Sequence, residues 1–215
     1  MKERFSYIIW TVLLALCLFL TVPELIRSFI YVGDHIKSYW YFFGGGVLYA
    51  VAALTLLKTN LQYYQTKHHE SLHEAACQIL LRPIESISAS SSKGGQLVHG
   101  GKSNLFITLA PYSFPLFTYL FLLLHLMIDP KYPGYLILVG FSFFFFLHAV
   151  SLQLSTRQPD LHRFGVLRSC LFIADFLSMN VAIILYAVRM KIGKAFLFYF
   201  EDIWRIVKGL VTVVG

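Results

Sequence analysis

The stretch FSYIIWTVLLALCLFLTV, from Phe5 to Val22, contains no charged residue and is almost entirely apolar. A helix needs about 20 such residues to cross the hydrocarbon core of a bilayer. A backbone in lipid must satisfy its hydrogen bonds within its own segment, and in a single run only a helix does so. We therefore predict a transmembrane helix here. Lys2 and Arg4 precede it, but no small-residue cleavage site follows, so we interpret it as an uncleaved span rather than a signal peptide.

Four further runs have the same character, and the composition of the whole chain agrees with them. They are Ser38–Leu57, Ser103–Ile128, Tyr132–Thr156 and Ser169–Val188, of which the last contains one acid, Asp175. The 215 residues are 57% hydrophobic and 13% charged, whereas soluble domains have about 25% charged residues. We predict an all-α integral membrane protein with about five transmembrane helices, whose solvent is the lipid bilayer.

Composition divides the chain into three parts. We expect an N-terminal transmembrane hairpin over residues 1–57, a core with three spans over residues 58–192, and a C-terminal helix over residues 193–215. Four charged residues of this last part share one helical face: Lys194, Glu201, Arg205 and Lys208. Apolar residues fill the other faces, which is typical of an amphipathic helix. Such a helix would lie in the membrane interface or form a lid across the bundle.

Within the core, a short helical segment precedes a glycine-containing loop. His68–Leu81 reads as a helix that ends before Pro83. It is too short to cross a membrane, so we predict a half-membrane segment or a continuation of the helix before it. Ile84–Gly101 alternates apolar and polar residues around Gly94 and Gly95, which favours a β-hairpin. A disordered serine-glycine loop is the alternative.

Glycines and prolines in two of the runs bear on helix packing. The triplet Gly44, Gly45 and Gly46 is small enough for close contact with another helix. Pro111 and Pro115 interrupt the hydrogen bonding of the third run and predict a kink there.

The cysteines and the net charge argue against several classes of protein. Cys17, Cys77 and Cys170 lie scattered in apolar context. This predicts three buried thiols, with no disulfide framework and no cysteine-based zinc motif. The net charge of +7 is expected at the lipid headgroups and gives no reason to propose nucleic acid as a partner.

The segment HESLH, from His69 to His73, has the pattern H-E-x-x-H. Residues four apart lie on one face of a helix, so the two histidines direct their imidazoles at one point. Zinc binds such nitrogens at about 2.0–2.1 Å in tetrahedral geometry. Glu70 is rotated by about 100° from His69, which suits a general base acting on an activated water rather than a ligand. His68 points elsewhere.

A zinc site of this kind needs a third ligand, and the downstream part of the chain offers several. The candidates are His99, His125, His148, Asp160, His162 and Asp175. Asp160 is favoured, because the hairpin returns the chain to the membrane face where His69 begins and two further spans bring Asp160 back to that face. His148, Asp175 and Glu74 are alternative or supporting ligands.

Four stretches together resemble the site-2 protease family of intramembrane zinc metalloproteases, in particular its small bacterial branch. They are HESLHEAAC, SSSKGGQLVHGG, LAPYSFP and FLHAVSLQLSTRQPDLHRFG, within about Lys67 to Val188. The resemblance implies a zinc ion with three ligands: His69, His73 and Asp160. It also implies Glu70 as the base and hydrolysis of peptide bonds in membrane-embedded or membrane-anchored proteins. The chain departs from better-known members, which have an Asp-Gly pair where this chain has Leu161 after the aspartate.

The distribution of charge predicts the orientation in the membrane. Lys2 and Arg4 indicate a cytoplasmic N-terminus. After two spans the histidine helix begins on the cytoplasmic side, and Arg157, Arg163 and Arg168 return to that side. By resemblance we expect a bacterial inner membrane, with the active site nearer the cytoplasm. Two other interpretations stay open: a non-catalytic membrane protein, such as a metal-transport or assembly component, and an inactive protease relative.

Overall fold

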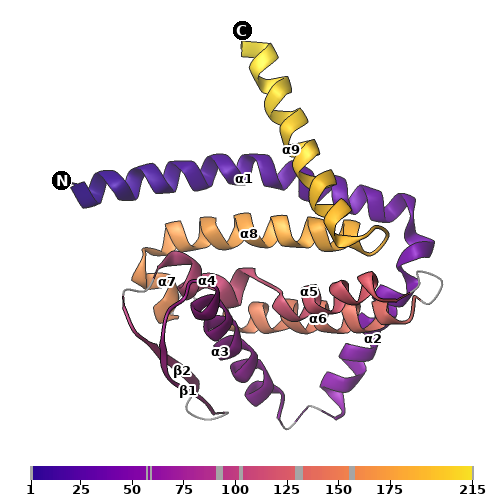
Figure 1. Cartoon of the computed structure of the whole chain (residues 1–215), viewed down its shortest axis with the longest axis horizontal. Helices are drawn as coiled ribbons and strands as arrows, with labels where there is room; N and C mark the ends of the chain where they lie inside the picture. Colours follow the sequence, from indigo (N-terminus) through magenta and orange to yellow (C-terminus); the bar gives the residue numbers. More distant parts are fainter. Residues whose placement is uncertain are drawn as a thin grey trace.

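The computed structural model describes residues 2–56, 58, 60–90, 94–101, 104–128, 133–154 and 158–214; of residues 2–5, 94, 125 and 213–214 it describes the backbone alone. This part of the chain is mostly helical, with one small antiparallel sheet (Figure 1). Three of its helices are long and apolar enough to cross a membrane: Ser6–Asp34, Tyr135–Gln153 and Val166–Ala187. Two shorter helices bent by 69° make a fourth if they form one broken span. The described residues thus contain three or four candidate spans rather than about five.

Two helix pairs form the body of the molecule. Helix α1 (Lys2–Asp34) packs along α8 (Val166–Ala187), and α2 (Trp40–Leu54) packs along α6 (Tyr135–Gln153) (Figure 1). The surface of α1 carries large apolar side chains such as Phe19, which is 62% exposed. Soluble proteins rarely leave large contiguous apolar surface in water, so this side of α1 is suited to lipid.

Helix α2 is shorter than its apolar run predicted. The run Ser38–Leu57 has the length of a span, but the short 3₁₀ helix η1 (Ile36–Tyr39) takes up its first residues. Helix α2 keeps 15 residues, which is about 22 Å at 1.5 Å per residue. The hydrocarbon core is about 30 Å thick, so a straight helix of this length does not cross it. The length of the apolar run alone overestimated the length of α2.

The close helix contact predicted for the glycine triplet is confirmed. A Cβ atom on Gly45 would lie 2.1 Å from the carbonyl oxygen of Ile137 in α6. On the facing helix, a Cβ atom on Gly140 would lie 1.9 Å from the carbonyl oxygen of Phe42. Any side chain at either position would force the two backbones apart, so the glycines set the spacing between α2 and α6.

The predicted kink in the third run is also confirmed, as a break between α4 (Leu105–Ser113) and α5 (Leu116–Leu123). The break falls at Pro115, which has no backbone N–H to donate. The side chain of Asn180 in α8 donates to the carbonyl oxygen of Ser113 at 2.9 Å, so a carbonyl freed by the break keeps a partner. A further 3₁₀ turn, η2 (Leu124–Leu126), follows α5.

The helix that carries the histidines, α3 (Leu61–Ile79), begins seven residues before the predicted start. It ends in a left-handed turn, since Leu81 has φ of 53° and Arg82 N–H donates to the carbonyl oxygen of Cys77 at 2.8 Å. This is the hydrogen bond of a Schellman motif, which closes helix C-termini. Cys77 is buried here, but Cys17 and Cys170 are exposed on α1 and α8, so the prediction of three buried thiols is wrong for two of them.

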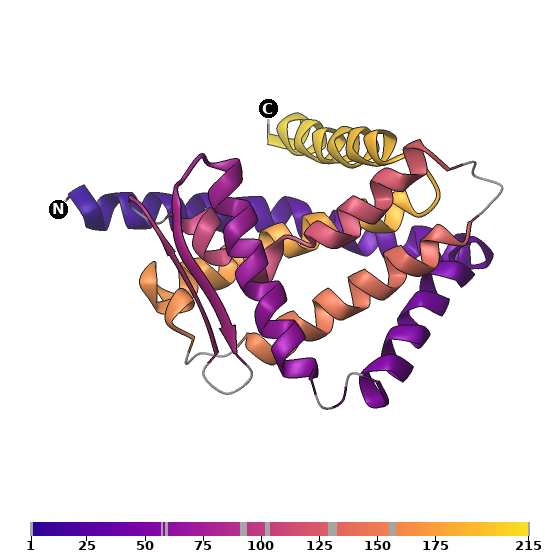
Figure 2. The same cartoon turned by 60° about the horizontal axis from the view of Figure 1, so that its bottom comes forward.

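The predicted β-hairpin is confirmed. Strand β1 (Ile84–Ser90) pairs antiparallel with β2 (Gly94–His99), with Ala89 opposite Gly95. Figure 2 shows the hairpin running beside α3. The turn predicted at residues 91–93 lies outside the described residues. The alternative of a disordered loop is wrong for the two strands.

The C-terminal amphipathic helix is α9 (Ile192–Val214). It packs on α1 and α8 and then projects away from the bundle (Figure 1). An ionic network links it to α1. Nη1 of Arg27 in α1 lies 3.0 Å from a carboxylate oxygen of Asp202 in α9 and 3.3 Å from a carboxylate oxygen of Glu24 in α1. Tyr186 donates to the other Glu24 oxygen at 2.6 Å, and Arg205 pairs with Asp202 at 2.9 Å.

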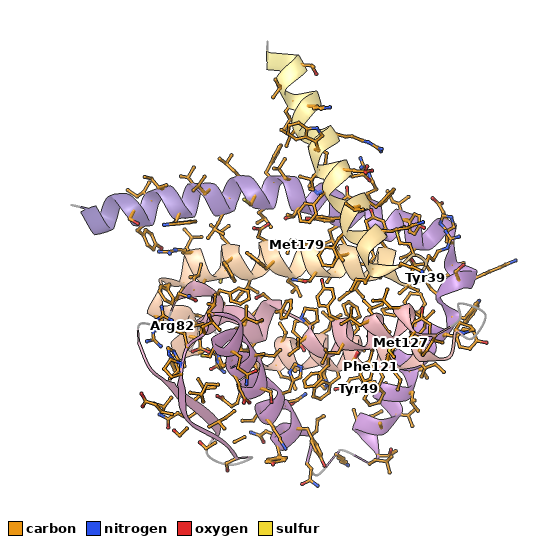
Figure 3. All side chains as sticks on the ribbon, in the orientation of Figure 1. Tyr39, Tyr49, Arg82, Phe121, Met127 and Met179 are labelled. Carbon is orange, nitrogen blue, oxygen red and sulfur yellow. The ribbon has the colours of Figure 1, made fainter. Side chains whose placement is uncertain are left out.

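The two ends of the bundle differ. The hairpin and the short helix α7 (Pro159–Arg163) lie near the N-terminus of α1, whereas α9 begins at the opposite end of α8 (Figure 1). Figure 3 places Arg82, at the start of the hairpin, and Tyr39, in η1, at these opposite ends. The histidines and Asp160 belong to the end with the hairpin.

Candidate metal centre

Two helices bring three metal-binding side chains to one point. His69 and His73 come from successive turns of α3, and Asp160 comes from the first turn of α7. The two Nε2 atoms are 3.1 Å apart. Oδ2 of Asp160 lies 3.5 Å from Nε2 of His69 and 3.6 Å from Nε2 of His73. Within the described residues, this is the one cluster of three histidine, cysteine or acidic side chains that could share an ion.

The spacing of these atoms fits a tetrahedral zinc ion. Two ligands bonded to zinc at about 2.0–2.1 Å with a tetrahedral angle are separated by about 3.3 Å. The three separations here, 3.1, 3.5 and 3.6 Å, lie on either side of that value. Two imidazoles and one carboxylate are also a ligand set that leaves a fourth position for water.

The outward nitrogens of both histidines are held by hydrogen bonds. Nδ1–H of His73 donates to the carbonyl oxygen of Ile107 at 2.8 Å, and Nδ1–H of His69 donates to Oε1 of Gln153 at 2.8 Å. The amide of Gln153 is oriented in turn, because its Nε2 donates to the carbonyl oxygen of Gln65 at 3.2 Å. These contacts fix both rings with the hydrogen on Nδ1 and the lone pair on Nε2.

Two Nε2 lone pairs and a carboxylate therefore point at one another, and a proton or a metal ion between them would stabilise this arrangement. The pKa values of the same groups show how strongly they interact. Burial alone would raise the pKa of Asp160, but His69 and His73 lower it well below its usual range. Burial alone would lower the pKa of His73, but its hydrogen bond and charge interaction with Asp160 raise it overall. The three groups interact strongly enough to shift one another's pKa, and together they could hold a metal ion.

Asp160 is positioned by its neighbours in α7 and α4. Pro159 begins α7, a position where its missing N–H costs nothing. Leu161, 2% exposed, anchors the helix in an apolar cluster. The hydroxyl of Tyr112 donates to Oδ2 of Asp160 at 3.2 Å, so the oxygen that faces the histidines is itself oriented. A buried leucine here follows the aspartate where the resembling family has glycine.

Glu70 lies beside the cluster and is 5% exposed. It is rotated from the ligand face, as its position in the pattern predicts, and it lines the same cavity as His69 and His73. Burial raises the pKa of its carboxyl group, and the nearby histidines lower it by a smaller amount. A carboxylate with a raised pKa is a better proton acceptor, which is the property that a general base needs.

The cluster opens into a cavity of about 1010 Å³. Pockets for small ligands have roughly 300–1,000 Å³, so this one has room for several residues of an extended polypeptide. Its walls come from α3, from β2 and from the ends of α4, α6 and α7. No described residue of α9 lines it, so α9 is not a lid over this cavity.

Two further residues of α3 lie outside the cluster: Glu74, which was an alternative ligand, and His68, which was predicted to point elsewhere. Glu74 accepts a hydrogen bond from Gln78 at 3.4 Å. His68 packs against the rings of Phe145 and Phe146, and burial lowers its pKa to about 4. It is therefore neutral and directed away from the metal-binding face, as predicted.

The candidates on later elements also have other surroundings. His148 is hydrogen-bonded to the hydroxyl of Tyr49, which Figure 3 labels on α2. Asp175 accepts from Thr21 at 3.0 Å, so α1 gives this buried acid its partner. His99 lines the cavity but is not in the cluster, and His162 is exposed on α7. The side chain of His125 lies outside the described residues.

Four contributions to the site were not predicted. Three are the amide of Gln153, the hydroxyl of Tyr112 and the carbonyl of Ile107. The fourth is the backbone of Gly95, which lies against the side chain of Glu70. Gln153 had a usable signal, because it is a polar residue near the end of an otherwise apolar run. Tyr112 lies within the stretch LAPYSFP, but nothing in the sequence indicates its partner. The other two are backbone contacts that only the fold reveals.

Comparisons with protein-family models, with curated proteins and with solved structures found no match to this chain.

Proposed function

We propose that this protein is a multi-pass membrane zinc metalloprotease, similar to the site-2 proteases, that hydrolyses peptide bonds of membrane-embedded or membrane-anchored proteins. One observation carries the proposal. Two histidine Nε2 atoms and a carboxylate oxygen of Asp160 converge within 3.6 Å of one another, next to the buried carboxyl group of Glu70. A cation site with a neighbouring base is the combination that metal-assisted hydrolysis needs.

Each residue of the site would have a separate role in hydrolysis. His69, His73 and Asp160 would hold the ion. When bound, zinc would polarise the scissile carbonyl group and lower the pKa of a water to about 7. Glu70 would accept a proton from the attacking water and deliver it to the leaving amide nitrogen, so that one water is added across one C–N bond. Gln153 and Tyr112 would keep two of the ligands in place.

The hairpin supports a polypeptide as the substrate. Strand β2 contributes Gly95, Gln96, Leu97 and His99 to the cavity wall, whereas no described residue of β1 lines it. One edge of β2 pairs with β1, and among the described residues no strand pairs with its other edge, where an extended chain could bind by strand addition. An unwound segment bound there would have its backbone beside the metal cluster.

The membrane setting supports an embedded or anchored substrate. Three helices in the described part of the chain are long and apolar enough to cross a bilayer, and α8 follows directly after the helix that carries Asp160. Basic residues near the site, including Lys58 and Arg163 in the cavity wall, favour the cytoplasmic side for this end. We place the protein in a bacterial inner membrane on the basis of the resemblance.

The test replaces the proposed base and keeps the ligands. The wild type and Glu70→Gln would be purified in detergent, reconstituted in vesicles and mixed with single-span peptides that carry a glycine or proline within the span. We expect both proteins to bind one zinc per chain. We expect peptide fragments, measured by mass spectrometry, from the wild type alone, because glutamine cannot accept the proton.

The outcomes also separate the alternative functions. A metal-transport or assembly protein would bind zinc and produce no fragments from any peptide, with or without Glu70. An inactive relative would bind the peptides without cleaving them. Cleavage that continues at the wild-type rate in Glu70→Gln would exclude Glu70 as the base.

A further inference from the structure

The hairpin makes one contact with the site that the metal cluster does not explain. Gly95 in β2 lies directly against the side chain of Glu70. A Cβ atom on Gly95 would be 2.3 Å from Oε1, 2.5 Å from Cγ and 2.6 Å from Cδ of Glu70. Glu70 therefore owes its burial in part to a strand backbone that carries no side chain at this point.

The strand is fixed against α3 close to this contact. Leu97 is two residues after Gly95, so both face the same side of β2. Leu97 packs against an apolar cluster that contains Ala76 and Cys77 of α3 together with Ile107 of α4. The hairpin thus has an anchor on the histidine helix, and this anchor sets how closely Gly95 approaches Glu70.

The geometry points to Gly95 as the positioning residue for Glu70: the hairpin backbone holds the carboxylate beside the cluster by direct contact, and any side chain at position 95 displaces it. This inference rests on the proposed function of Glu70 as the base. The three nearest atoms that a Cβ would meet are in the flexible part of the Glu70 side chain rather than in backbone. An added methyl group would therefore move the base and leave the fold and the metal ligands in place.

The activity experiment uses Gly95→Ala in the full chain, reconstituted as above. We expect one zinc per chain, a melting temperature within about 2 °C of the wild type, and kcat lower by about 100-fold with KM little changed. A displacement of about 1 Å in a reacting group can cost that factor. The matched control is Gly33→Ala in α1, where a Cβ atom meets nothing within 4 Å and kcat should stay at the wild-type value.

A second experiment tests the contact without using activity. Gly95→Val should lower the melting temperature by about 3–6 °C in the wild-type background, since overpacking destabilises a fold of this size by such amounts. In a Glu70→Ala background the space of the glutamate is vacant, so the same substitution should cost less than half as much. An equal loss in both backgrounds would show that Gly95 does not act through Glu70.

The two experiments distinguish failure of this inference from failure of the proposed function. If the wild type cleaves and Gly95→Ala cleaves equally well, the inference is wrong and the proposed function stands. If the wild type cleaves no peptide, the proposed function fails and the positioning role fails with it.

Discussion

Two polar clusters at opposite ends of the bundle contain similar groups but differ in charge balance. At the end of the bundle where α9 begins, Glu24 and Asp202 share the guanidinium of Arg27, and Asp202 also pairs with Arg205. Each carboxylate there has a cation supplied by the chain. At the other end, Asp160 faces two histidine nitrogens that are fixed with their lone pairs toward it.

This difference separates a structural network from a binding site. Buried charges are costly unless they are paired, so a network that is neutral within the chain is complete by itself. The cluster on α3 and α7 contains no lysine or arginine to pair with Asp160, and its three ligand atoms are spaced so that they could hold a metal ion. Four variants test this comparison, from the largest expected effect to the smallest.

Removal of the histidine ligands should have the largest effect. In the double variant His69→Ala/His73→Ala, zinc should fall from about one ion per chain to near zero, and cleavage should be abolished, because one carboxylate cannot hold the ion. Elemental analysis of the purified protein measures the metal content. Zinc retained at full stoichiometry would place the metal elsewhere on the chain.

Disruption of the complete network should cost stability and leave the metal in place. Arg27→Met leaves Glu24 and Asp202 buried without their shared cation, which costs roughly 3–5 kcal/mol in fully buried pairs. Arg27 is 48% exposed, so we expect about 3 kcal/mol, the low end of that range. SDS titration in mixed micelles measures the unfolding free energy. If Arg27→Met lost zinc under conditions where the protein is still fully folded, the two clusters would not be independent of each other.

A variant that is destabilised without a change in charge provides the comparison for Arg27→Met. Gly140→Ala places a methyl group 1.9 Å from the carbonyl oxygen of Phe42, so α2 and α6 must move apart. We expect about 2 kcal/mol of destabilisation, as in other overpacked cores, with zinc retained. The control is Gly44→Ala, where a Cβ atom has nothing within 4 Å. An equal loss of stability in the two variants would mean that the close contact is not responsible.

The smallest effect should come from the hydroxyl that orients Asp160. Tyr112→Phe keeps the ring and removes the hydrogen bond to Oδ2, and such supporting groups contribute about 10–100-fold to metal affinity. We expect zinc affinity to fall by about tenfold, measured by competition with a chelator. Phe117→Leu, on the neighbouring α5, is a control outside this hydrogen bond and should leave the affinity unchanged.

The sequence predicted those features that depend on local periodicity. The four-residue spacing of His69 and His73 places them on one helical face whatever the rest of the chain does. Alternation of apolar and polar residues indicated the hairpin, and the small size of Gly45 indicated close helix packing. In each case the structural feature follows from residues close together in the sequence or from the size of a single residue.

Features that depend on how elements meet were harder to predict. The apolar run that contains α2 overestimated the length of this helix, because an apolar pattern does not reveal the 3₁₀ turn at its start. Helix α3 begins at Leu61 because polar residues before the motif extend the helix, which an apolar pattern does not reveal. The contacts of Gln153 with His69 and of Gly95 with Glu70 join residues far apart in the chain, so only the packing of the elements defines them.

X-ray absorption at the zinc edge, measured on the purified wild type, tests the central claim most directly. We expect one zinc per chain with two imidazole nitrogens and oxygen ligands at about 2.0–2.1 Å, and loss of the zinc signal itself in His69→Ala/His73→Ala. A wild-type protein that binds no zinc at stoichiometric level, or a spectrum dominated by sulfur ligands, would contradict it.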